Sequence, residues 1–210
     1  MGFDKLMAPL CGLPVAAHSL ARFERSEAVE EIILVIRSER RAEFEKIIRE
    51  QKFSKVATIV DGGAERHLSV WNGVASVSAR TRLIAVHDAA RPLVSSSLID
   101  EAFALAAEKG AVSLAAPVVD TLKRADEAHQ VIDSVNRADL WGMQTPQVFR
   151  IDWLREAYQR IIDSGRSVTD EVSALQEAGY PVTLIYNPDW NVKITFPRDL
   201  ELAEKLIRQT

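Results

Sequence analysis

The chain has 210 residues, of which 47% are hydrophobic and 27% charged, and its formal net charge at pH 7 is −4. This length fits one domain over residues 1–210, and the acidic balance argues against an extended nucleic-acid surface. The single cysteine, Cys11, excludes an intrachain disulfide. With no signal-peptide pattern and no apolar run near the roughly 20 residues of a membrane helix, we expect a cytoplasmic protein that binds no membrane.

Strands and helices are predicted to alternate between residues 30 and 118. The strands are short runs of β-branched and aliphatic residues, typical of strands buried on both faces of a parallel sheet. Ser38 is the expected N-cap of the first helix, and Ser97 with Asp100 resembles a capping box in the third, which Gly110 ends. The predicted strands are 30–38, 55–60, 82–86 and 111–118, and the predicted helices are 40–50, 65–76 and 96–110.

This alternation implies right-handed crossovers and an α/β fold, with a mostly parallel sheet and helices on both faces. Ligands of such sheets bind beyond the carboxyl ends of the strands. The segments to inspect for a site are therefore 61–64, 87–92 and the residues after Val118.

The alternation stops at residue 119. From 119 to 149 polar and apolar residues mix over short stretches around a turn-rich centre at 125–130, and we predict a β-hairpin that forms an arm over 119–140. Regular elements then resume to the C-terminus. We predict helices at 153–162, 167–179 and 198–209, the second ended by Gly179, and strands at 182–187 and 191–196.

Two segments at predicted strand ends are candidate ligand sites. Gly62 and Gly63 follow a buried strand, and two glycines allow a positive φ or a close backbone approach to a ligand; a tight connection is the alternative. Asp88 and Arg91 follow the next strand with only alanines between them. They are candidates for binding a ligand, or for a local ion pair that caps the next helix.

Further polar residues suit phosphate recognition. Thr121 and Arg137, with Lys123 and Arg124, give the predicted arm hydroxyl and guanidinium donors, although solvated surface charge is the alternative. Thr145 precedes a proline, which favours an extended or turn backbone. The segment 169–171 is best explained as a helix N-cap, with a metal role for Asp170 or Glu171 as the less favoured alternative.

Two lysines stand out from their surroundings. Lys193 lies within the apolar stretch 191–196, where it is either an exposed edge residue or a cation directed into a site. Lys5 lies in a polar turn ahead of the first predicted strand. It too is either an exposed residue or a cation directed into a site.

Taken in order, the motifs DKL, VDGGAER..SV, HDAARP, APVVDTLK, NR..LW..QTPQ.F, TDE.SAL and N.KIT.P.DL resemble the 2-C-methyl-D-erythritol 4-phosphate cytidylyltransferase family. The resemblance runs from Lys5 to the C-terminal helix. Ribitol-5-phosphate cytidylyltransferases share most of these motifs and are the alternative.

The resemblance implies a Rossmann-like nucleotidyltransferase fold and a homodimer whose β-arms interlock. It implies that the substrates are CTP and a polyol phosphate, 2-C-methyl-D-erythritol 4-phosphate. The products would be 4-diphosphocytidyl-2-C-methyl-D-erythritol and pyrophosphate, on the non-mevalonate route to isoprenoid precursors. Mg²⁺ would accompany the triphosphate and keep several of its waters, with no metal ligand from the chain.

The resemblance also assigns roles to the candidate residues. It makes Lys5 and Lys193 the catalytic lysines. It implies that one group of four residues contacts the nucleotide and that a second group contacts the polyol phosphate. Within the second group, Thr121 and Arg137 would contribute to the site of the neighbouring subunit. The nucleotide group is Gly62, Gly63, Ser69 and Asp88, and the phosphate group is Arg91, Thr121, Arg137 and Thr145.

Two departures from the family pattern bear on function. Ala64 stands where relatives often have aspartate, which affects cytosine selectivity if the family contact uses the carboxylate. The chain begins at Met1-Gly2, where the family's glycine-rich loop ends. We therefore expect a strand of about 5–6 residues and that loop to be missing from an incomplete sequence, which would expose two sheet edges and leave the chain poorly folded. The alternative is a complete, non-catalytic dimer that binds nucleotide.

Overall fold

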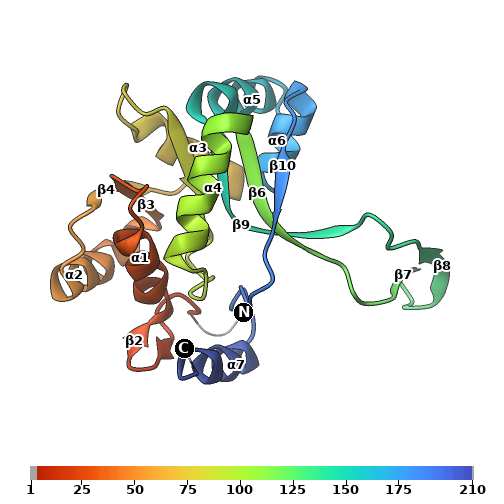
Figure 1. The fold of residues 1–210 in the computed structure, drawn as a ribbon, viewed down its shortest axis with the longest axis horizontal. Coiled ribbons are helices and arrows are strands. Elements are labelled where there is room, and N and C mark those ends of the chain that lie inside the picture. The colour runs from red at the N-terminus through yellow and green to blue at the C-terminus, as the bar shows by residue number, and fades with distance from the viewer. Residues whose placement is uncertain (1–3, 210) are drawn as a thin grey trace.

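The computed structural model describes residues 4–209, so Met1 and Gly2 lie outside the described part. Figure 1 shows an α/β body from which a hairpin extends. The strands are β1 (Pro9–Leu10), β2 (Leu13–Pro14), β3 (Ile32–Ile36), β4 (Val56–Asp61), β5 (Leu83–Val86), β6 (Ala111–Pro117), β7 (Leu122–Ala125), β8 (Val131–Val135), β9 (Trp141–Arg150) and β10 (Thr183–Tyr186). The helices are α1 (Val15–Arg25), α2 (Arg41–Gln51), α3 (Arg66–Ser76), α4 (Ser96–Lys109), α5 (Ile151–Asp163), α6 (Glu171–Ala178) and α7 (Pro197–Ile207), with a 3₁₀ turn, η1 (Ser38–Arg40).

The largest sheet has the strand order β10-β6-β9-β5. β10 runs parallel to β6, whereas β9 runs antiparallel to both β6 and β5, so β5, β6 and β10 share one direction. A second pair, β3 and β4, is also parallel. The expected α/β class with a mostly parallel arrangement is therefore confirmed.

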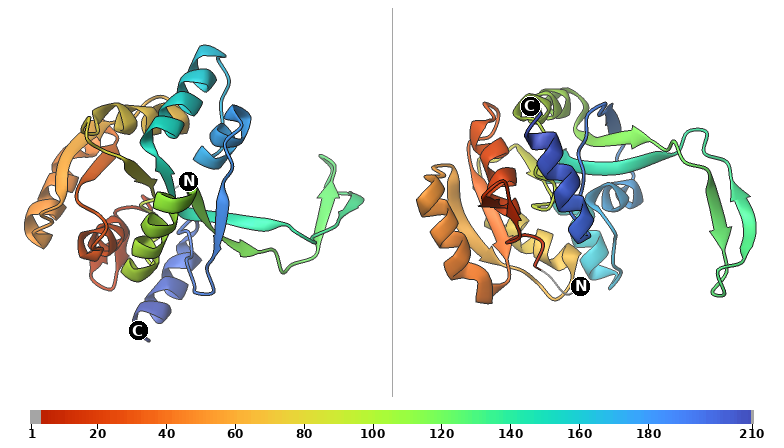
Figure 2. Two further views of the ribbon diagram at one scale, coloured as in Figure 1. Left: turned by 45° about the horizontal axis from the view of Figure 1, so that its top comes forward. Right: turned by 90° about the horizontal axis from the view of Figure 1, so that it is seen from below.

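Helices cover both faces of the large sheet, as the alternation of side chains along β9 shows. Val148 packs with α4 residues in one buried cluster, and its neighbour Phe149 packs with α5 and α6 residues in another. Successive residues of a strand point to opposite faces. The two clusters are therefore two cores, one on each side of the sheet. Figure 2 gives two further views of the ribbon.

The β3–β4 pair forms a separate layer together with α1 and α2. Leu34, Ile36, Phe44, Ile47 and Leu20 make its buried cluster. Among the described residues β3 pairs only with β4, and β5 pairs only with β9. The β3–β4 pair and the large sheet are therefore not joined through hydrogen bonds, and a cavity lies between β3 and β5.

The projecting arm is present as a hairpin of β7 and β8, which pair antiparallel with Leu122 opposite Val135. Figure 1 shows it extending well away from the helices of the body. Two of its apolar residues, Val131 and Ile132, are 65% and 61% exposed. The arm therefore makes no core of its own within this chain.

Several predicted elements were wrong or missed. Residues 141–150, for which no regular element was predicted, form β9 in the middle of the large sheet, and α1 had no counterpart in the predictions. Residues 191–196 form no strand, because the N–H groups of Thr195 and Phe196 donate to the Asp199 side chain instead of to a neighbouring strand.

Two predicted N-caps are also corrected. Ser95, not Ser97, caps α4 by accepting from the Leu98 N–H at 3.2 Å. Ser38 does not cap α2 with its side chain, because it is the first residue of the 3₁₀ turn η1, which precedes that helix. Asp170 caps α6 and Gly179 ends it in the left-handed conformation, both as predicted.

Candidate active site

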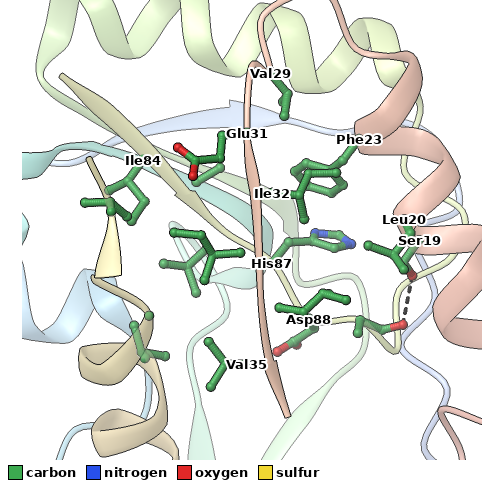
Figure 3. Close-up of a pocket in the computed structure, with 18 of the residues that line it drawn as sticks. Ser19, Leu20, Phe23, Val29, Glu31, Ile32, Val35, Ile84, His87 and Asp88 are labelled. Carbon is green, nitrogen blue, oxygen red and sulfur yellow. Dashed lines mark hydrogen bonds between the residues drawn. The ribbon is translucent and has the colours of Figure 1, made fainter. Parts of the chain in front are cut away.

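A cavity of about 1040 Å³ lies between β3 and β5. Along the strands most of its lining is apolar, with Ile32, Val35 and Ile84 facing into it, although Glu31 also lines it there (Figure 3). At the carboxyl end of β5 the lining is charged, because Arg66, Asp88 and Lys193 meet there. Lys5 and Ser69 also line the cavity.

Asp88 and Lys193 form the central ion pair of this polar end. The Lys193 Nζ lies 2.8 Å from Asp88 Oδ2, and the Arg91 Nε lies 3.6 Å from the same oxygen. Burial alone raises the pKa of the Asp88 carboxyl, but the Lys193 ammonium, with Arg66 and Arg91, outweighs burial and holds that pKa below its ordinary value. Asp88 is therefore a carboxylate at neutral pH, and it fixes the position of Lys193.

Lys193 reaches the site from a segment without regular structure. The N–H of its neighbour Ile194 donates to the Ala90 carbonyl at 2.8 Å, and the Ile194 side chain is fully buried. This anchor ties the segment to the 87–91 turn and leaves the Lys193 side chain 42% exposed beside the cavity. Of the two possibilities for Lys193, the structure supports a cation directed into the site.

The glycine pair after β4 is shaped by the start of α3. The Gly62 N–H donates to the Ile36 carbonyl at 2.7 Å, and the Gly63 N–H donates to Ser69 Oγ at 3.0 Å. A Cβ on Gly63 would lie 2.5 Å from the Leu68 Cβ. Neither glycine has a positive φ, so these glycines serve close approach rather than a left-handed turn.

Arg66 is a site residue that the sequence did not reveal. Its Nη1 and Nη2 donate to the two carboxylate oxygens of Glu171 at 2.7 and 3.0 Å, and the Tyr158 hydroxyl donates to Glu171 at 2.8 Å. Glu171 is fully buried, whereas the Arg66 side chain is 39% exposed and lines the cavity. Burial alone lowers the pKa of Arg66, but Glu171, with Asp88, holds it above its ordinary value.

The predicted dipole role for Glu171 was incomplete. It does begin α6, but its carboxylate joins that helix to α3 and α5 through Arg66 and Tyr158. Because α3 follows the glycine pair directly, this network fixes the helix on which Ser69 and Arg66 stand. Only the charge of Glu171 is visible in the sequence; its burial is not.

Arg91 is partly buried and bonded mainly to carbonyl oxygens. Its Nη1 donates to the Asn191 carbonyl at 2.7 Å, and burial lowers its pKa. The Asp88–Arg91 ion pair exists, but α4 begins at Ser96 with Ser95 as its cap, so the pair does not cap that helix. A contact between Arg91 and a substrate phosphate stays a prediction.

Thr145 lies beneath the same turn and is 5% exposed. The Asp88 N–H donates to its hydroxyl at 3.0 Å, and that hydroxyl lies 3.0 Å from Nδ1 of His87. The structure therefore brings Thr145 to the site, beside the backbone that carries Asp88.

Thr121 and Arg137 lie on or beside the arm and do not line the cavity. Arg137 donates to the Val119 carbonyl, and Lys123 donates to Ser134 Oγ at 2.6 Å. The structure does not bring these residues to Asp88 and Lys193 of the same chain.

The described residues hold no group of three or more His, Cys, Asp or Glu side chains able to bind a metal ion. Asp170 caps α6 and also accepts from Gln147 Nε2 at 3.2 Å. Among residues 4–209, no helix has the length and apolarity needed to cross a membrane.

Comparisons with known proteins agree on one family. The sequence model of the family "2-C-methyl-D-erythritol 4-phosphate cytidylyltransferase" matches residues 1–209. A protein of that name from Alkaliphilus oremlandii (strain OhILAs) is 38% identical over 208 residues, which cover 98% of this chain and 88% of the relative. The crystal structure of the cytidylyltransferase from Thermus thermophilus matches with a TM-score of 0.83 and 30% identity, over 98% of this chain and 94% of that one. The 4-diphosphocytidyl-2C-methyl-D-erythritol synthase from Anaerococcus prevotii gives a TM-score of 0.85 at 26% identity, over 95% of this chain and 88% of that one.

Proposed function

The chain belongs to the 2-C-methyl-D-erythritol 4-phosphate cytidylyltransferase family, and we propose that it joins CTP to 2-C-methyl-D-erythritol 4-phosphate. The products are 4-diphosphocytidyl-2-C-methyl-D-erythritol and pyrophosphate, in the non-mevalonate synthesis of isoprenoid precursors. The observation that carries this proposal is the cluster of Lys193, Arg91 and Arg66 around Asp88, beside a cavity that Lys5 also lines. It lies at the strand end where sheets of this class bind ligands. We place the reaction in the cytoplasm.

The reaction needs cations more than it needs a base. A phosphate oxygen of the polyol phosphate attacks the α-phosphorus of CTP in line, a new P–O bond forms, and the bond to pyrophosphate breaks. The attacking phosphate is already ionised, so no protein group has to remove a proton. Two anions must approach each other, and the non-bridging oxygens must be stabilised as charge builds up on them.

Lys5 and Lys193 can meet this need. Both line the cavity, and Asp88 holds the Lys193 ammonium in place. A lysine held by one carboxylate keeps further N–H donors for a phosphate oxygen. We therefore assign phosphate stabilisation to the two lysines and orientation of Lys193 to Asp88.

The glycine pair and Ser69 suit the nucleotide. Gly63 and Ala64 are exposed next to the N-terminus of α3, so their backbone is open to a ligand. Ala64 offers only its backbone, so cytosine recognition at this position rests on main-chain groups.

A magnesium ion would be held mainly by the triphosphate. The charged end of the cavity offers it one carboxylate, Asp88. A single carboxylate suits an ion that keeps several waters and takes few protein ligands. When bound, Mg²⁺ neutralises part of the charge on the phosphate oxygens.

We also propose that the chain forms a homodimer through the arm. Support comes from the exposed apolar residues Val131 and Ile132 and from the position of Thr121 and Arg137, which lie away from the charged cluster of their own chain. Exposed apolar patches on a protein surface often mark contact sites. An arm that reaches the neighbouring subunit would place Thr121 and Arg137 near that subunit's polyol phosphate.

Replacing Val131 and Ile132 with aspartate should convert the dimer to a monomer, because each partner would then bury two unpaired charges. Light scattering after gel filtration should give about twice 23.4 kDa for the unmodified chain and 23.4 kDa for the variant. The same substitution at Leu202, an exposed residue of α7, is the control and should leave the mass unchanged. A monomeric unmodified chain at micromolar concentration would refute the arm interface.

Pyrophosphate release tests the proposed reaction. With CTP, methylerythritol phosphate and Mg²⁺ present, the purified chain should release pyrophosphate continuously, and removal of the polyol phosphate or chelation of Mg²⁺ with EDTA should stop it. Binding of CTP without any release would contradict the proposal and favour a binding protein that does not catalyse.

A further inference from the structure

His87 lies at the carboxyl end of β5, directly before Asp88, and no role in the reaction has been given to it. Its ring points toward α1, where it contacts Phe23 with ring centroids 4.8 Å apart (Figure 3). A histidine in this position is usually either a proton carrier or a structural donor and acceptor. Its neighbours decide between these roles.

Both ring nitrogens of His87 have partners. Nε2 lies 3.1 Å from the Arg91 carbonyl oxygen, and Nδ1 lies 3.0 Å from Thr145 Oγ1. A carbonyl oxygen can only accept, so Nε2 carries the hydrogen. In a neutral ring Nδ1 is then the acceptor, and the Thr145 hydroxyl donates to it.

The surroundings favour the neutral ring. Burial lowers the pKa of His87 to about 4. The charged groups that face it are Asp88, which raises this pKa, and Arg91, which lowers it, while α1 contributes the apolar ring of Phe23. Neutral His87 therefore predominates at physiological pH.

In this arrangement the Thr145 hydroxyl has no hydrogen left to donate. It donates its one hydrogen to His87 and accepts the Asp88 N–H at 3.0 Å. A substrate phosphate offers only acceptors, so it would need a hydrogen that this hydroxyl no longer has. Thr145 is thus better suited to holding the turn than to binding the phosphate through its side chain.

The bonds of His87 and Thr145 fix the turn at both ends. Thr145 holds the Asp88 N–H, His87 holds the Arg91 carbonyl, and the Arg91 N–H donates to the Asp88 carbonyl at 2.9 Å. This turn presents the Asp88 carboxylate to Lys193. A shift of about 1 Å in such a group can cost on the order of 100-fold in rate.

We propose that His87 is a positioning residue, which as a neutral ring protonated on Nε2 acts through the Thr145 hydroxyl and the Arg91 carbonyl to hold Asp88 against Lys193. Its effect on turnover rests on the proposed function, whereas its hydrogen bonds do not. The inference is therefore tested by one structural and one kinetic measurement.

¹⁵N NMR of the imidazole nitrogens gives the structural test, with His87→Gln identifying the signals. At pH 7 the ring should be neutral, with Nε2 protonated and Nδ1 unprotonated. Thr145→Val should shift the Nδ1 signal, and Thr145→Ser, which keeps the hydroxyl, should leave it near its original position. A ring protonated on Nδ1, or an Nδ1 signal unaffected by Thr145→Val, would overturn the inference.

Kinetics give the second test. Thr145→Val and His87→Phe should lower kcat by about 10- to 100-fold, while Thr145→Ser should restore most of the rate. His18→Gln is the control, because the ring of His18 bonds the Leu10 carbonyl rather than the 87–91 turn. A Thr145→Val variant that raises only KM for the polyol phosphate would instead make Thr145 a phosphate ligand and refute the proposal. Should the unmodified chain show no turnover, the proposed function fails and the NMR result alone decides this inference.

Discussion

Replacing Lys193 with alanine is expected to lower kcat by about 10²–10³-fold, the usual cost of losing one group that stabilises charge in the transition state. The ammonium lies 2.8 Å from Asp88, and Lys193 lines the cavity as Lys5 and Arg66 do. Removing it leaves the α-phosphate oxygens with one cation fewer at the moment when their charge increases. Steady-state pyrophosphate release measures the loss.

Lys46→Ala supplies the matched control, since Lys46 lies on the surface of α2, where its ammonium is 3.8 Å from Glu50. Its kcat should equal that of the unmodified chain. The Lys193 variant should also keep its melting temperature, because its side chain is 42% exposed and the anchoring residue is Ile194. A kcat near that of the unmodified chain would mean that Lys193 is a surface residue after all.

Replacing Arg66 with methionine should lower the free energy of unfolding by about 3–5 kcal/mol, because it strands a buried carboxylate. Glu171 is fully buried and both of its oxygens accept from Arg66. The Tyr158 hydroxyl would remain as its partner and cannot neutralise the charge. Urea unfolding of the purified chain gives the change.

A second substitution, Glu171→Gln, added to Arg66→Met should recover much of this loss, since the double variant buries no charge. Arg41→Met is the matched control, which breaks the exposed Arg41–Asp61 pair at 3.2 Å. An exposed pair of this kind should be worth less than about 1 kcal/mol. If Arg66→Met costs no more than Arg41→Met, or if the two changes at 66 and 171 simply add, the buried pair does not stabilise the fold.

Much of the α/β framework could be predicted from hydrophobic periodicity. The aliphatic run of residues 32–36 forms β3, and Gly179 ends α6 as a left-handed residue. These features are set by neighbouring residues along the chain, so a local pattern is enough to reveal them.

Elements that depend on distant partners were missed. β9 contains Gln144 and Gln147, whose side chains bond to Asn191 and Asp170 from far along the chain. Such polar residues weaken the alternating pattern of a strand. The segment 191–196 shows the converse, since it alternates like a strand but gives its N–H groups to Asp199.

Some residues of the candidate site could also be predicted from the sequence, and others could not. Asp88 and Lys193 were predicted as site residues by motif, and the structure brings them into contact. The pairing of Arg66 with Glu171 joins residues 105 positions apart, and the role of His87 depends on Thr145, 58 positions away. The sequence shows which residues carry a charge. Which of these side chains are buried, and which distant residues they pair with, is seen only in the folded structure.

The central claim is that this chain transfers a cytidylyl group from CTP to 2-C-methyl-D-erythritol 4-phosphate. The most direct test is a competition in which the purified chain receives CTP, Mg²⁺ and equal amounts of 2-C-methyl-D-erythritol 4-phosphate and ribitol 5-phosphate, with products identified by mass spectrometry. We predict that 4-diphosphocytidyl-2-C-methyl-D-erythritol is the dominant product. Equal or greater formation of CDP-ribitol, or no nucleotidyl transfer at all, would contradict the account.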